Sequence, residues 1–259
     1  MILDEIVAKK KIRLQERKAK FPLEQLKQQA LKLQRKPLDF QYALRQEGLS
    51  IIAEVKKASP SKGVIRPDFD PQAIARAYLK AGVQAMSILT EEDFFQGSDE
   101  YFKQIRSFAN TPLLRKDFII DEYQIYEAYC MGADAILLIA AILDNTTMKR
   151  FYNITTTLGM HCLNEVHDQQ ELERVLKLGF PIVGINNRNL KTFEEKLETT
   201  GELRNSIPSD RVVVSESGIR TPEDIQMIAG YQVDGVLIGE AFMRNPNVTL
   251  AVEQLRGSQ

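Results

Sequence analysis

Cysteine is scarce in this chain, with Cys130 and Cys162 the only two among 259 residues. Neither stands at a metal-binding spacing from His161 or His167, which indicates reduced thiols in a reducing compartment. The sequence also lacks an apolar run of membrane-spanning length and the hydrophobic core of a signal peptide. Acidic residues among the first lysines argue against an organellar transit peptide. We therefore expect a soluble, cytoplasmic protein.

An excess of one charge is missing too, because 34 Lys and Arg residues face 35 Asp and Glu residues, a net charge of -1. This balance favours neither a nucleic acid nor a membrane as partner, although a local basic patch can still bind an anionic small molecule. Hydrophobic residues make up 44% and charged residues 27%, as in folded globular proteins. A length of 259 residues is usual for one α/β barrel domain.

Residues 1–48 show helical periodicity without a strand pattern. Apolar residues recur at helical spacing between Ile2 and Val7, and Pro22 and Pro37 interrupt the segment, which predicts two or three helices. We interpret the basic run Lys9–Lys11 as a solvated helix face rather than a binding patch.

From Ser50 onward, short apolar runs alternate with amphipathic stretches, which predicts right-handed βαβ units and a parallel sheet. About eight such units over roughly 210 residues fit a closed barrel better than an open doubly wound sheet. No glycine-rich dinucleotide loop follows the first run. We predict an α/β fold with one TIM-barrel domain over residues 1–259, in which a helical extension (1–48) precedes the (β/α)8 barrel (49–259). The expected strands are Ile51–Val55, Ala85–Leu89, Pro112–Leu114, Ala135–Ile139, Met160–Asn164, Ile182–Ile185, Val212–Ser215 and Val236–Ile238.

Helical patterns fill the segments between these runs, and a glycine ends most of them. Gly82, Gly132, Gly159, Gly179 and Gly230 each stand shortly before the next strand, where we expect left-handed C-terminal caps. The expected helices are Pro71–Ala81, Tyr101–Phe108, Glu122–Met131, Thr146–Leu158, Gln169–Leu178, Thr221–Ala229 and Asn247–Leu255.

The first strand carries charge on one face only. Alternation places Ile51, Ala53 and Val55 against the helix layer, and puts Ile52, Glu54 and Lys56 on the other face, with the two charged residues in the barrel mouth. Because an unpaired buried charge is very costly, the two must pair with each other or face solvent in a site. A purely structural ion pair is the alternative for these two residues alone.

Other strand tails carry polar residues as well, whereas strand starts do not. Reacting groups of such barrels lie at the carboxyl ends of the strands. Lysines and carboxylates in one cavity also push one another's pKa values toward acid and base roles. The tail residues are Glu54, Lys56, Lys116, Glu165, Asn186 and Glu216, with Arg188 just beyond Asn186.

The last two strands are followed by glycine-containing loops. Ser217-Gly218 and Gly239-Glu240 stand where such barrels commonly bind phosphate, and a short helix through Met243 is expected to begin at the second loop. Glycine lets backbone N–H groups approach an anion closely. Glu240 cannot direct its carboxylate at a dianion, so we assign only its backbone N–H to this role.

Several motifs resemble those of the indole-3-glycerol phosphate synthases, over essentially the whole chain. Ala53–Gly63 contains the first-strand pattern Glu-x-Lys-x-x-Ser-Pro, which is the most specific of them. The other matching segments are Leu89–Glu91, Phe94–Ser98, Leu114–Ile119, Gly184–Leu190 and Ser215–Ile219. The resemblance implies that residues 1–48 lie over the catalytic end of the barrel and help to shape the pocket.

The resemblance also implies an activity. It is that of a carboxy-lyase of tryptophan biosynthesis, which converts 1-(2-carboxyphenylamino)-1-deoxyribulose 5-phosphate to indole-3-glycerol phosphate, carbon dioxide and water. A neutral ring carbon attacks a ketone poorly, so an ammonium donor at the carbonyl oxygen suits this chemistry. We expect no metal and no organic cofactor, a phosphorylated small molecule as substrate, neither nucleic acid nor membrane as partner, and a monomer.

Residue roles follow from the matching motifs. Lys116 resembles the general acid at the ketone, and Lys56 a residue that contacts the substrate carboxylate and phosphate region. How the two lysines divide the acid steps stays open. Glu165 resembles the carboxylate that assists dehydration, and Glu54 and Asn186 resemble orienting residues. The implied binding contacts are Arg188 for the substrate carboxylate, Ser59, Ser217, Gly218, Gly239 and Glu240 for phosphate and hydroxyls, and Phe95, Phe118 and Leu237 for the aromatic ring.

One departure and three alternatives accompany this interpretation. Asn164 stands where an apolar residue is expected against the helix layer, so its amide needs a partner. A Schiff-base aldolase would use Lys56 or Lys116 as nucleophile, but the first-strand motif argues against it. A phosphate-sugar isomerase of the same pathway would be expected to use a cysteine at a strand tail, where neither cysteine stands. A non-catalytic binding barrel would need no paired acid and base.

Overall fold

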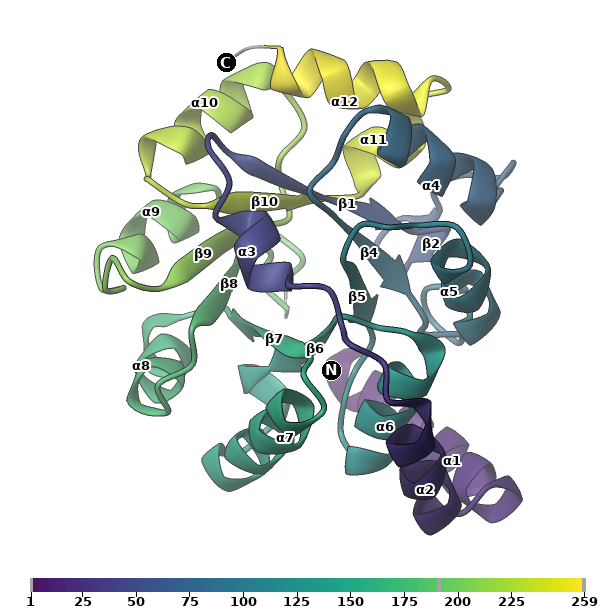
Figure 1. Ribbon diagram of the computed structural model, residues 1–259. Helices are drawn as coiled ribbons and strands as arrows, with labels where there is room; N and C mark the ends of the chain where they lie inside the picture. Colours follow the sequence, from purple (N-terminus) through teal and green to yellow (C-terminus); the bar gives the residue numbers. More distant parts are fainter. Residues whose placement is uncertain (1, 191, 258–259) are drawn as a thin grey trace.

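Eight parallel strands close into a barrel, in the order β1-β10-β9-β8-β7-β6-β5-β4, in this computed structural model (Figure 1). The (β/α)8 fold expected from the alternating pattern is confirmed. The structure describes residues 2–190 and 192–257, so residues 1, 191, 258 and 259 of the expected domain lie outside the described part. The barrel strands are β1 (Ser50–Val55), β4 (Ala85–Leu89), β5 (Leu113–Lys116), β6 (Ala135–Ile139), β7 (His161–Val166), β8 (Ile182–Asn186), β9 (Val212–Glu216) and β10 (Gly235–Ile238).

Several strands extend further toward their carboxyl ends than the apolar runs indicated. Strand β5 ends at Lys116 and β7 at Val166, two residues beyond the expected ends in each case. Neighbouring strands still offer partners there, since Lys116 pairs with Leu89 and Val166 with Ile185. Glu54, Lys116, Glu165, Asn186 and Glu216 therefore lie within barrel strands and not in loops, whereas Lys56 follows the last residue of β1.

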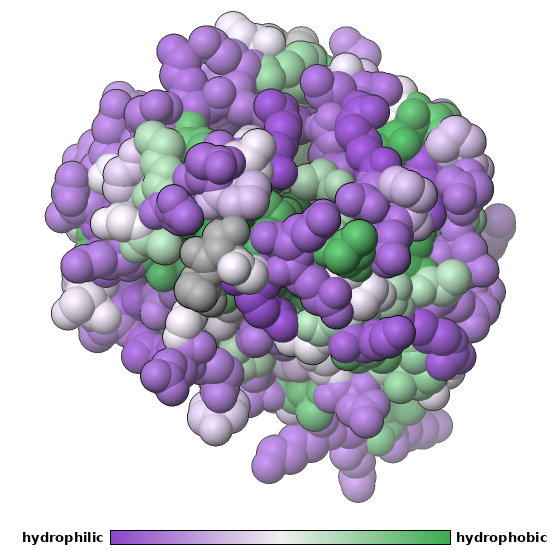
Figure 2. Space-filling view, turned by 90° about the horizontal axis from the view of Figure 1, so that it is seen from above, coloured by the Kyte–Doolittle hydropathy of each residue, from purple (hydrophilic) through white to green (hydrophobic). Residues whose placement is uncertain are grey.

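Helices cover the outside of the barrel, and most begin at a side chain that accepts a hydrogen bond from the first turn. Such caps are Asp70, Ser98, Asp121, Asp144, Asp168, Thr221 and Asn247. Hydrophilic residues prevail on the side of the barrel seen in Figure 2. The helices after β1 are α4 (Pro71–Lys80), α5 (Asp99–Arg106), α6 (Glu122–Met131), α7 (Asn145–Thr157), α8 (Gln169–Lys177), α9 (Glu198–Arg204), α10 (Pro222–Gly230), α11 (Glu240–Arg244) and α12 (Val248–Arg256).

Three small elements were not expected from the sequence. Helix α9 was missed because its seven residues, ETTGELR, carry no apolar stripe. The two-stranded sheet of β2 (Ala58–Ser59) and β3 (Gly63–Val64) and the 3-10 turn η1 (Ala140–Ile142) are too short for a periodic signal. Four of the five expected glycine caps have left-handed backbone, but Gly230 does not. It belongs to α10, and Gln232 adopts the left-handed conformation instead, with φ of 58°.

Three helices form the N-terminal extension: α1 (Ile2–Lys20), α2 (Leu23–Leu33) and α3 (Phe40–Leu44). Helix α2 packs beside α6 outside the barrel, whereas α3 lies across the amino end (Figure 1). Phe40 and Leu44 of α3 are fully buried, in one cluster with the residues that begin several strands. The extension thus closes the amino end of the barrel, while the first residues of α1 reach the carboxyl end.

Asp134, just before β6, anchors this arrangement at the amino end. Its buried carboxylate pairs with Arg106 at 2.7 Å and with Arg35 at 3.4 Å. It also accepts hydrogen bonds from the backbone N–H groups of Leu38 and Leu113. One side chain therefore joins the α2–α3 connection to α5 and β5.

Replacing Asp134 with alanine should strongly destabilise the fold, because two arginines and two N–H groups lose their partner. We expect the free energy of unfolding to fall by about 3–5 kcal/mol, measured by urea denaturation. Asp68→Ala removes an exposed ion pair with Arg66 and is the matched control. That control should change stability by less than about 1 kcal/mol, and an equally small change for Asp134→Ala would contradict the anchoring role.

Candidate active site

A cavity opens at the carboxyl ends of the strands. Helix α1 covers part of it with Ile2, Leu3 and Ile6. Every predicted site residue except Ser59 lies in the wall: Glu54, Lys56, Phe95, Lys116, Phe118, Glu165, Asn186, Arg188, Glu216, Ser217, Gly218, Leu237, Gly239 and Glu240. Ser59 is buried in β2, and its hydroxyl has no hydrogen-bond partner among the described residues.

Glu54 and Lys56 form one ion-pair group in the cavity. The Lys56 ammonium lies 2.5 Å from Oε2 of Glu54, which is itself buried. Ile51, Ala53 and Val55 of β1 face the helix layer, as the alternation predicted. A Cβ atom at Gly239, on the neighbouring β10 tail, would collide with the Glu54 carboxylate. Glycine at this position therefore leaves the space that the carboxylate occupies.

Lys116 is the centre of a second ion-pair group. Its ammonium lies 2.5 Å from Oε2 of Glu216 and 3.2 Å from Oε2 of Glu165. The three residues come from β5, β9 and β7, which are not adjacent in the barrel. A Cβ atom at Gly184 of β8 would collide with Oε1 of Glu216, an oxygen that has no partner among the described residues.

The electrostatics of this group separate its members into different protonation states. Burial alone would lower the pKa of Lys116, but Glu216, Glu165 and Glu54 outweigh it and raise that pKa. For Glu216, burial together with Glu165 and Glu54 overcomes the effect of Lys116 and raises the pKa. For Glu165, the effect of burial is overcome by Lys116 and His167, which lower the pKa. The cavity thus holds a charged lysine, a charged carboxylate and a carboxyl group that is readily protonated.

His167 is a site neighbour that the sequence analysis missed. Its Nε2 lies 3.2 Å from Oε1 of Glu165, and its Nδ1 lies 3.1 Å from Oε2 of Glu171. Burial lowers the pKa of His167, but the two carboxylates outweigh it and raise the pKa to about 10. The expected strand ended at Asn164, so the alternation was not carried on to this position.

The apolar part of the cavity suits a planar ring. Phe95 and Phe118 lie with ring centroids 6.0 Å apart at 40°, and Leu237 lines the cavity from β10. Leu89, Leu137 and Ile139 add to the apolar wall. An aromatic ligand would exchange water for these side chains on entering.

The loops after β9 and β10 form the polar side of the cavity. Ser217 and Gly218 both have left-handed backbone, with φ of 68° and 82°, a costly conformation for a serine. The expected short helix after Gly239 is present as α11. Burial raises the pKa of Glu240, but Arg244, Lys62 and Arg220 outweigh it and lower that pKa. Cationic side chains therefore surround this end of the cavity.

Arg188 already has an anionic partner. Its Nε lies 2.9 Å from Oε1 of Glu195, and its Nη1 donates to the Ser61 hydroxyl at 3.3 Å. Arg220 pairs with the same Glu195 carboxylate. A substrate carboxylate that binds Arg188 must therefore compete with Glu195.

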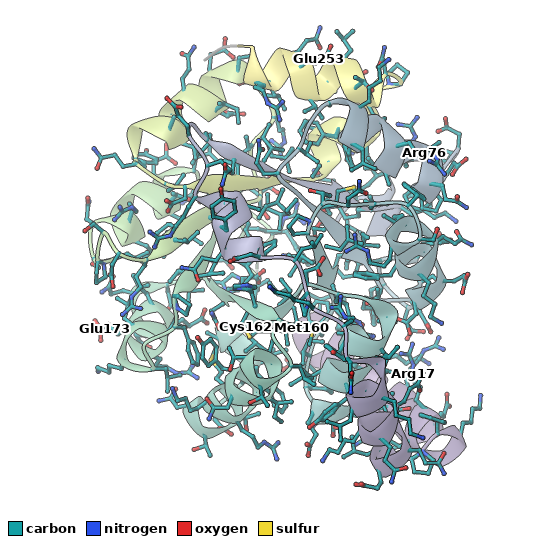
Figure 3. The ribbon with its side chains drawn as sticks, in the orientation of Figure 1. Arg17, Arg76, Met160, Cys162, Glu173 and Glu253 are labelled. Atoms are coloured by element: carbon teal, nitrogen blue, oxygen red, sulfur yellow. The ribbon has the colours of Figure 1, made fainter. Side chains whose placement is uncertain are left out.

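Two residues that raised questions in the sequence lie away from the cavity. Cys162 is buried among the residues between barrel and helices, near Met160 (Figure 3). The Asn164 amide, also fully buried, donates to the carbonyls of Ile182 at 2.8 Å and Cys162 at 3.2 Å. Asn164 therefore has the partners that its position requires, although its Oδ1 has none among the described residues.

Ion pairs attach α1 to the barrel beside the cavity. Lys10 is buried and lies 2.8 Å from Oδ1 of Asp117, the residue after Lys116. The interpretation of Lys9–Lys11 as a solvated face is therefore wrong for Lys10, although Lys9 and Lys11 are exposed. Arg17, labelled on α1 in Figure 3, forms further ion pairs with Glu92 before α5, Asp99 of α5 and Glu127 of α6.

Comparison with known proteins gives a consistent result over the whole chain. A family model described as indole-3-glycerol phosphate synthase matches residues 3–255. A protein named indole-3-glycerol phosphate synthase from Acetivibrio thermocellus is 52% identical over 261 residues, which cover 99% of each chain. The protein of that name from Clostridium acetobutylicum is 49% identical over 245 residues, covering 95% of this chain and 93% of its own.

Solved structures resemble the chain in fold at much lower identity. Thiamine phosphate pyrophosphorylase from Pyrococcus furiosus has a TM-score of 0.62 at 17% identity, covering 81% of this chain and 95% of its own. A 3-hexulose-6-phosphate synthase has a TM-score of 0.64 at 12% identity, covering 81% of this chain and 99% of its own. At these identities the likeness shows the barrel fold alone.

Replacing Lys10 with methionine should loosen α1, because Asp117 loses one of its two nearest cations while it stays buried. We expect amide hydrogen exchange in α1 to accelerate by about tenfold or more. Lys9→Met and Lys11→Met remove exposed charges from the same helix turns and should leave that exchange unchanged. Equal exchange rates in all three variants would show that Lys10 does not attach the helix.

Proposed function

This chain belongs to the indole-3-glycerol phosphate synthase family, and we propose that Lys116, Glu165 and Glu216 carry out the family's reaction in the cavity described above. The chain is a carboxy-lyase of tryptophan biosynthesis. It acts on a phosphorylated small-molecule substrate, and the reaction closes, decarboxylates and dehydrates 1-(2-carboxyphenylamino)-1-deoxyribulose 5-phosphate. The single observation that carries our assignment of residues is the Lys116 ammonium between two buried carboxylates.

In the first step, the ring carbon that bears the carboxylate attacks the ketone. A carbon–carbon bond forms, and the carbonyl oxygen takes a proton that we assign to Lys116. A preorganised ammonium is suited to this step, because negative charge develops on that oxygen in the transition state. Loss of carbon dioxide then returns the electron pair to the ring. The apolar wall around Phe95 and Phe118 supports the folded-back substrate conformation that cyclisation needs.

Dehydration requires a second acid and a base. The hydroxyl left by the first step departs as water once it is protonated, and the nitrogen lone pair supplies the electrons through the ring. A base then removes a proton from the methylene carbon beside the nitrogen, and that electron pair forms the double bond of the indole. We assign stabilisation of the positive nitrogen to Glu165, which is held ionised. Glu216 has the raised pKa of a group that can hold the proton between steps. Lys56, paired only with Glu54 among the contacts described here, is assigned to substrate binding, with Glu54 and Asn186 as orienting residues.

The charged ends of the substrate have matching partners in the cavity. We assign the phosphate to the backbone of Ser217-Gly218 and Gly239-Glu240, near Arg220 and Lys62. The substrate carboxylate is assigned to Arg188, where it replaces Glu195. The Ser59 hydroxyl is buried, has no partner among the described residues and does not line the cavity, so its expected contact with the phosphate gains no support from the geometry.

We further propose that the extension (1–48) and the barrel (49–259) act as one domain, in a cytoplasmic monomer. The wall of the cavity combines Ile2, Leu3 and Ile6 with barrel residues of the same chain, which supports this organisation. Both cysteines are free, as expected in a reducing compartment. Among the described residues, no helix is long and apolar enough to cross a membrane.

The assignment of Lys116 is tested by Lys116→Met. Wild-type protein should convert the carboxyphenylamino-deoxyribulose phosphate to a product with indole absorbance and fluorescence. The variant should lose about 100-fold or more in kcat, because the ammonium acts mainly in the transition state. Its Kd for a reduced substrate analogue should stay within about tenfold of wild type. A variant that retains more than about a tenth of the wild-type kcat would remove Lys116 from the acid role.

The phosphate assignment predicts that inorganic phosphate competes with the substrate. KM should rise linearly with phosphate concentration while kcat stays constant, since the anion occupies only free enzyme. Arg220→Gln should weaken this inhibition several-fold, because a cation beside the anion is lost. Inhibition that lowers kcat without raising KM would place the anion elsewhere.

A further inference from the structure

His167 lies between two carboxylates, at the end of β7 and outside the main cavity wall. Its backbone N–H and its Nδ1 both contact Oε2 of Glu171, at 2.9 and 3.1 Å. Glu171 is itself fixed, because its backbone N–H donates a hydrogen bond to the side chain of Asp168, the N-cap of α8. On the other side, Nε2 of His167 lies 3.2 Å from Oε1 of Glu165. The imidazole is only 11% exposed, so its orientation is determined by these contacts.

Both ring nitrogens of His167 face carboxylate oxygens. A neutral imidazole has one N–H donor, and the remaining nitrogen would then turn a lone pair toward a carboxylate. The imidazolium has two N–H donors: Nδ1 lies at hydrogen-bond distance from Glu171, and Nε2 forms an ion pair with Glu165 at 3.2 Å without hydrogen-bond geometry. This arrangement is in line with a pKa that the two carboxylates raise to about 10 against the effect of burial. His167 is therefore a buried cation within contact distance of Glu165.

Glu165 is thereby contacted on both oxygens by different cations. Oε1 faces His167 and Oε2 faces Lys116 at 3.2 Å. Without His167, the three buried carboxylates Glu54, Glu165 and Glu216 would share two lysines, Lys56 and Lys116. A buried carboxylate without a cation tends to take up a proton. The His167 cation therefore influences which of the three carboxylates takes up a proton.

We propose that His167 is a positioning residue that binds Oε1 of Glu165, directs Oε2 at Lys116 and keeps this carboxylate charged during the reaction. The inference deepens the proposed function and rests on the assignment of Glu165 made there. His167 itself does not line the main cavity, so its effect on the substrate is exerted through Glu165.

Other charged groups near His167 complete its surroundings. A second cavity beside the first one is lined by His167, Leu3 of α1, Ala141 of η1 and the segment after β8. Its charged lining residues are Asp168, Glu171, Arg188, Glu194 and Lys196. Asp168 caps α8, and Arg188 is held by Glu195. Glu165 and Glu171 are the carboxylates that directly contact the ring.

The charge of His167 can be observed without substrate. The chain has only two histidines, His161 and His167, so a protein labelled with 15N-histidine gives two ring systems. We expect the His167 ring to stay protonated through neutral pH and to titrate near pH 10. His161, whose pKa burial lowers, should titrate below pH 6.5. His161→Gln assigns the two sets of signals. A His167 ring that is neutral at pH 7 would overturn the proposal.

The effect on catalysis is tested by His167→Gln, with His161→Gln as the matched control at the other end of β7. Loss of the His167 cation raises the pKa of Glu165. As the pH is lowered, the charged form of Glu165 that the proposed reaction needs therefore disappears at a higher pH than in wild type. We expect the acid limb of the kcat profile to move up by one pH unit or more, about tenfold in proton concentration, with KM within about twofold. The His161→Gln profile should match wild type.

Glu171→Gln provides a second variant. Removing this carboxylate lowers the pKa of His167, so the 15N titration of the His167 ring should move clearly below pH 10. The acid limb of the kcat profile should stay at its wild-type position, because His167 is still charged at the low pH where Glu165 would otherwise take up a proton. A His167 titration that does not move would overturn the proposal, so this variant decides the question if His167→Gln does not fold.

The outcomes also separate this inference from the proposed function. Absence of indole formation by wild-type protein would reject the proposed function, whatever the titration shows. Wild-type indole formation together with an acid limb that does not move in His167→Gln, or a His167 titration that does not move in Glu171→Gln, would reject the positioning role alone.

Discussion

The ammonium group of Lys116, buried between Glu165 and Glu216, is the interaction on which the catalytic end of this barrel depends. Each of these charges would be costly to bury alone, so the group is stable only while all three are in place. Strands β5, β7 and β9 supply one member each, and closure of the barrel brings them together. Barrel closure and the proposed acid–base chemistry therefore both require the register that brings the tails of β5, β7 and β9 together.

Space for this group is provided by residues with no side chain. Gly184 and Gly239 stand where a Cβ atom would collide with the Glu216 and Glu54 carboxylates. Their role follows from close approach and not from unusual backbone angles, since neither has a positive φ. Packing and charge placement are thus determined together, because an alanine at either position would move a carboxylate away from its lysine.

A buried ion pair also attaches the N-terminal helix α1 to the site. Asp117 follows Lys116 directly and is bound by Lys10 of α1 at 2.8 Å and by the buried Arg115 at 3.3 Å. The helix that contributes Ile2, Leu3 and Ile6 to the apolar wall is therefore attached one residue away from the assigned acid. Loosening of α1 would affect both the wall and the position of the Lys116 strand tail. At the other end of the barrel, Asp134 and α3 hold the amino ends of the strands together through ion pairs and buried apolar contacts.

Much of the fold and of the candidate site could be predicted from the local alternation of apolar and polar residues. Alternation within Ile51–Lys56 assigns Glu54 and Lys56 to the barrel mouth because successive strand residues point to opposite faces. Polar residues at strand tails likewise indicate one shared cavity, since parallel strands end at the same edge. Long-range partners are a different matter. The contacts of Lys10 with Asp117 and of Lys116 with Glu165 and Glu216 join residues far apart in the sequence, which no local periodicity encodes. The sequence by itself determined which residues stand at the catalytic end, and only the tertiary structure decided which charges meet there, because burial makes each charge select its partner by distance in space.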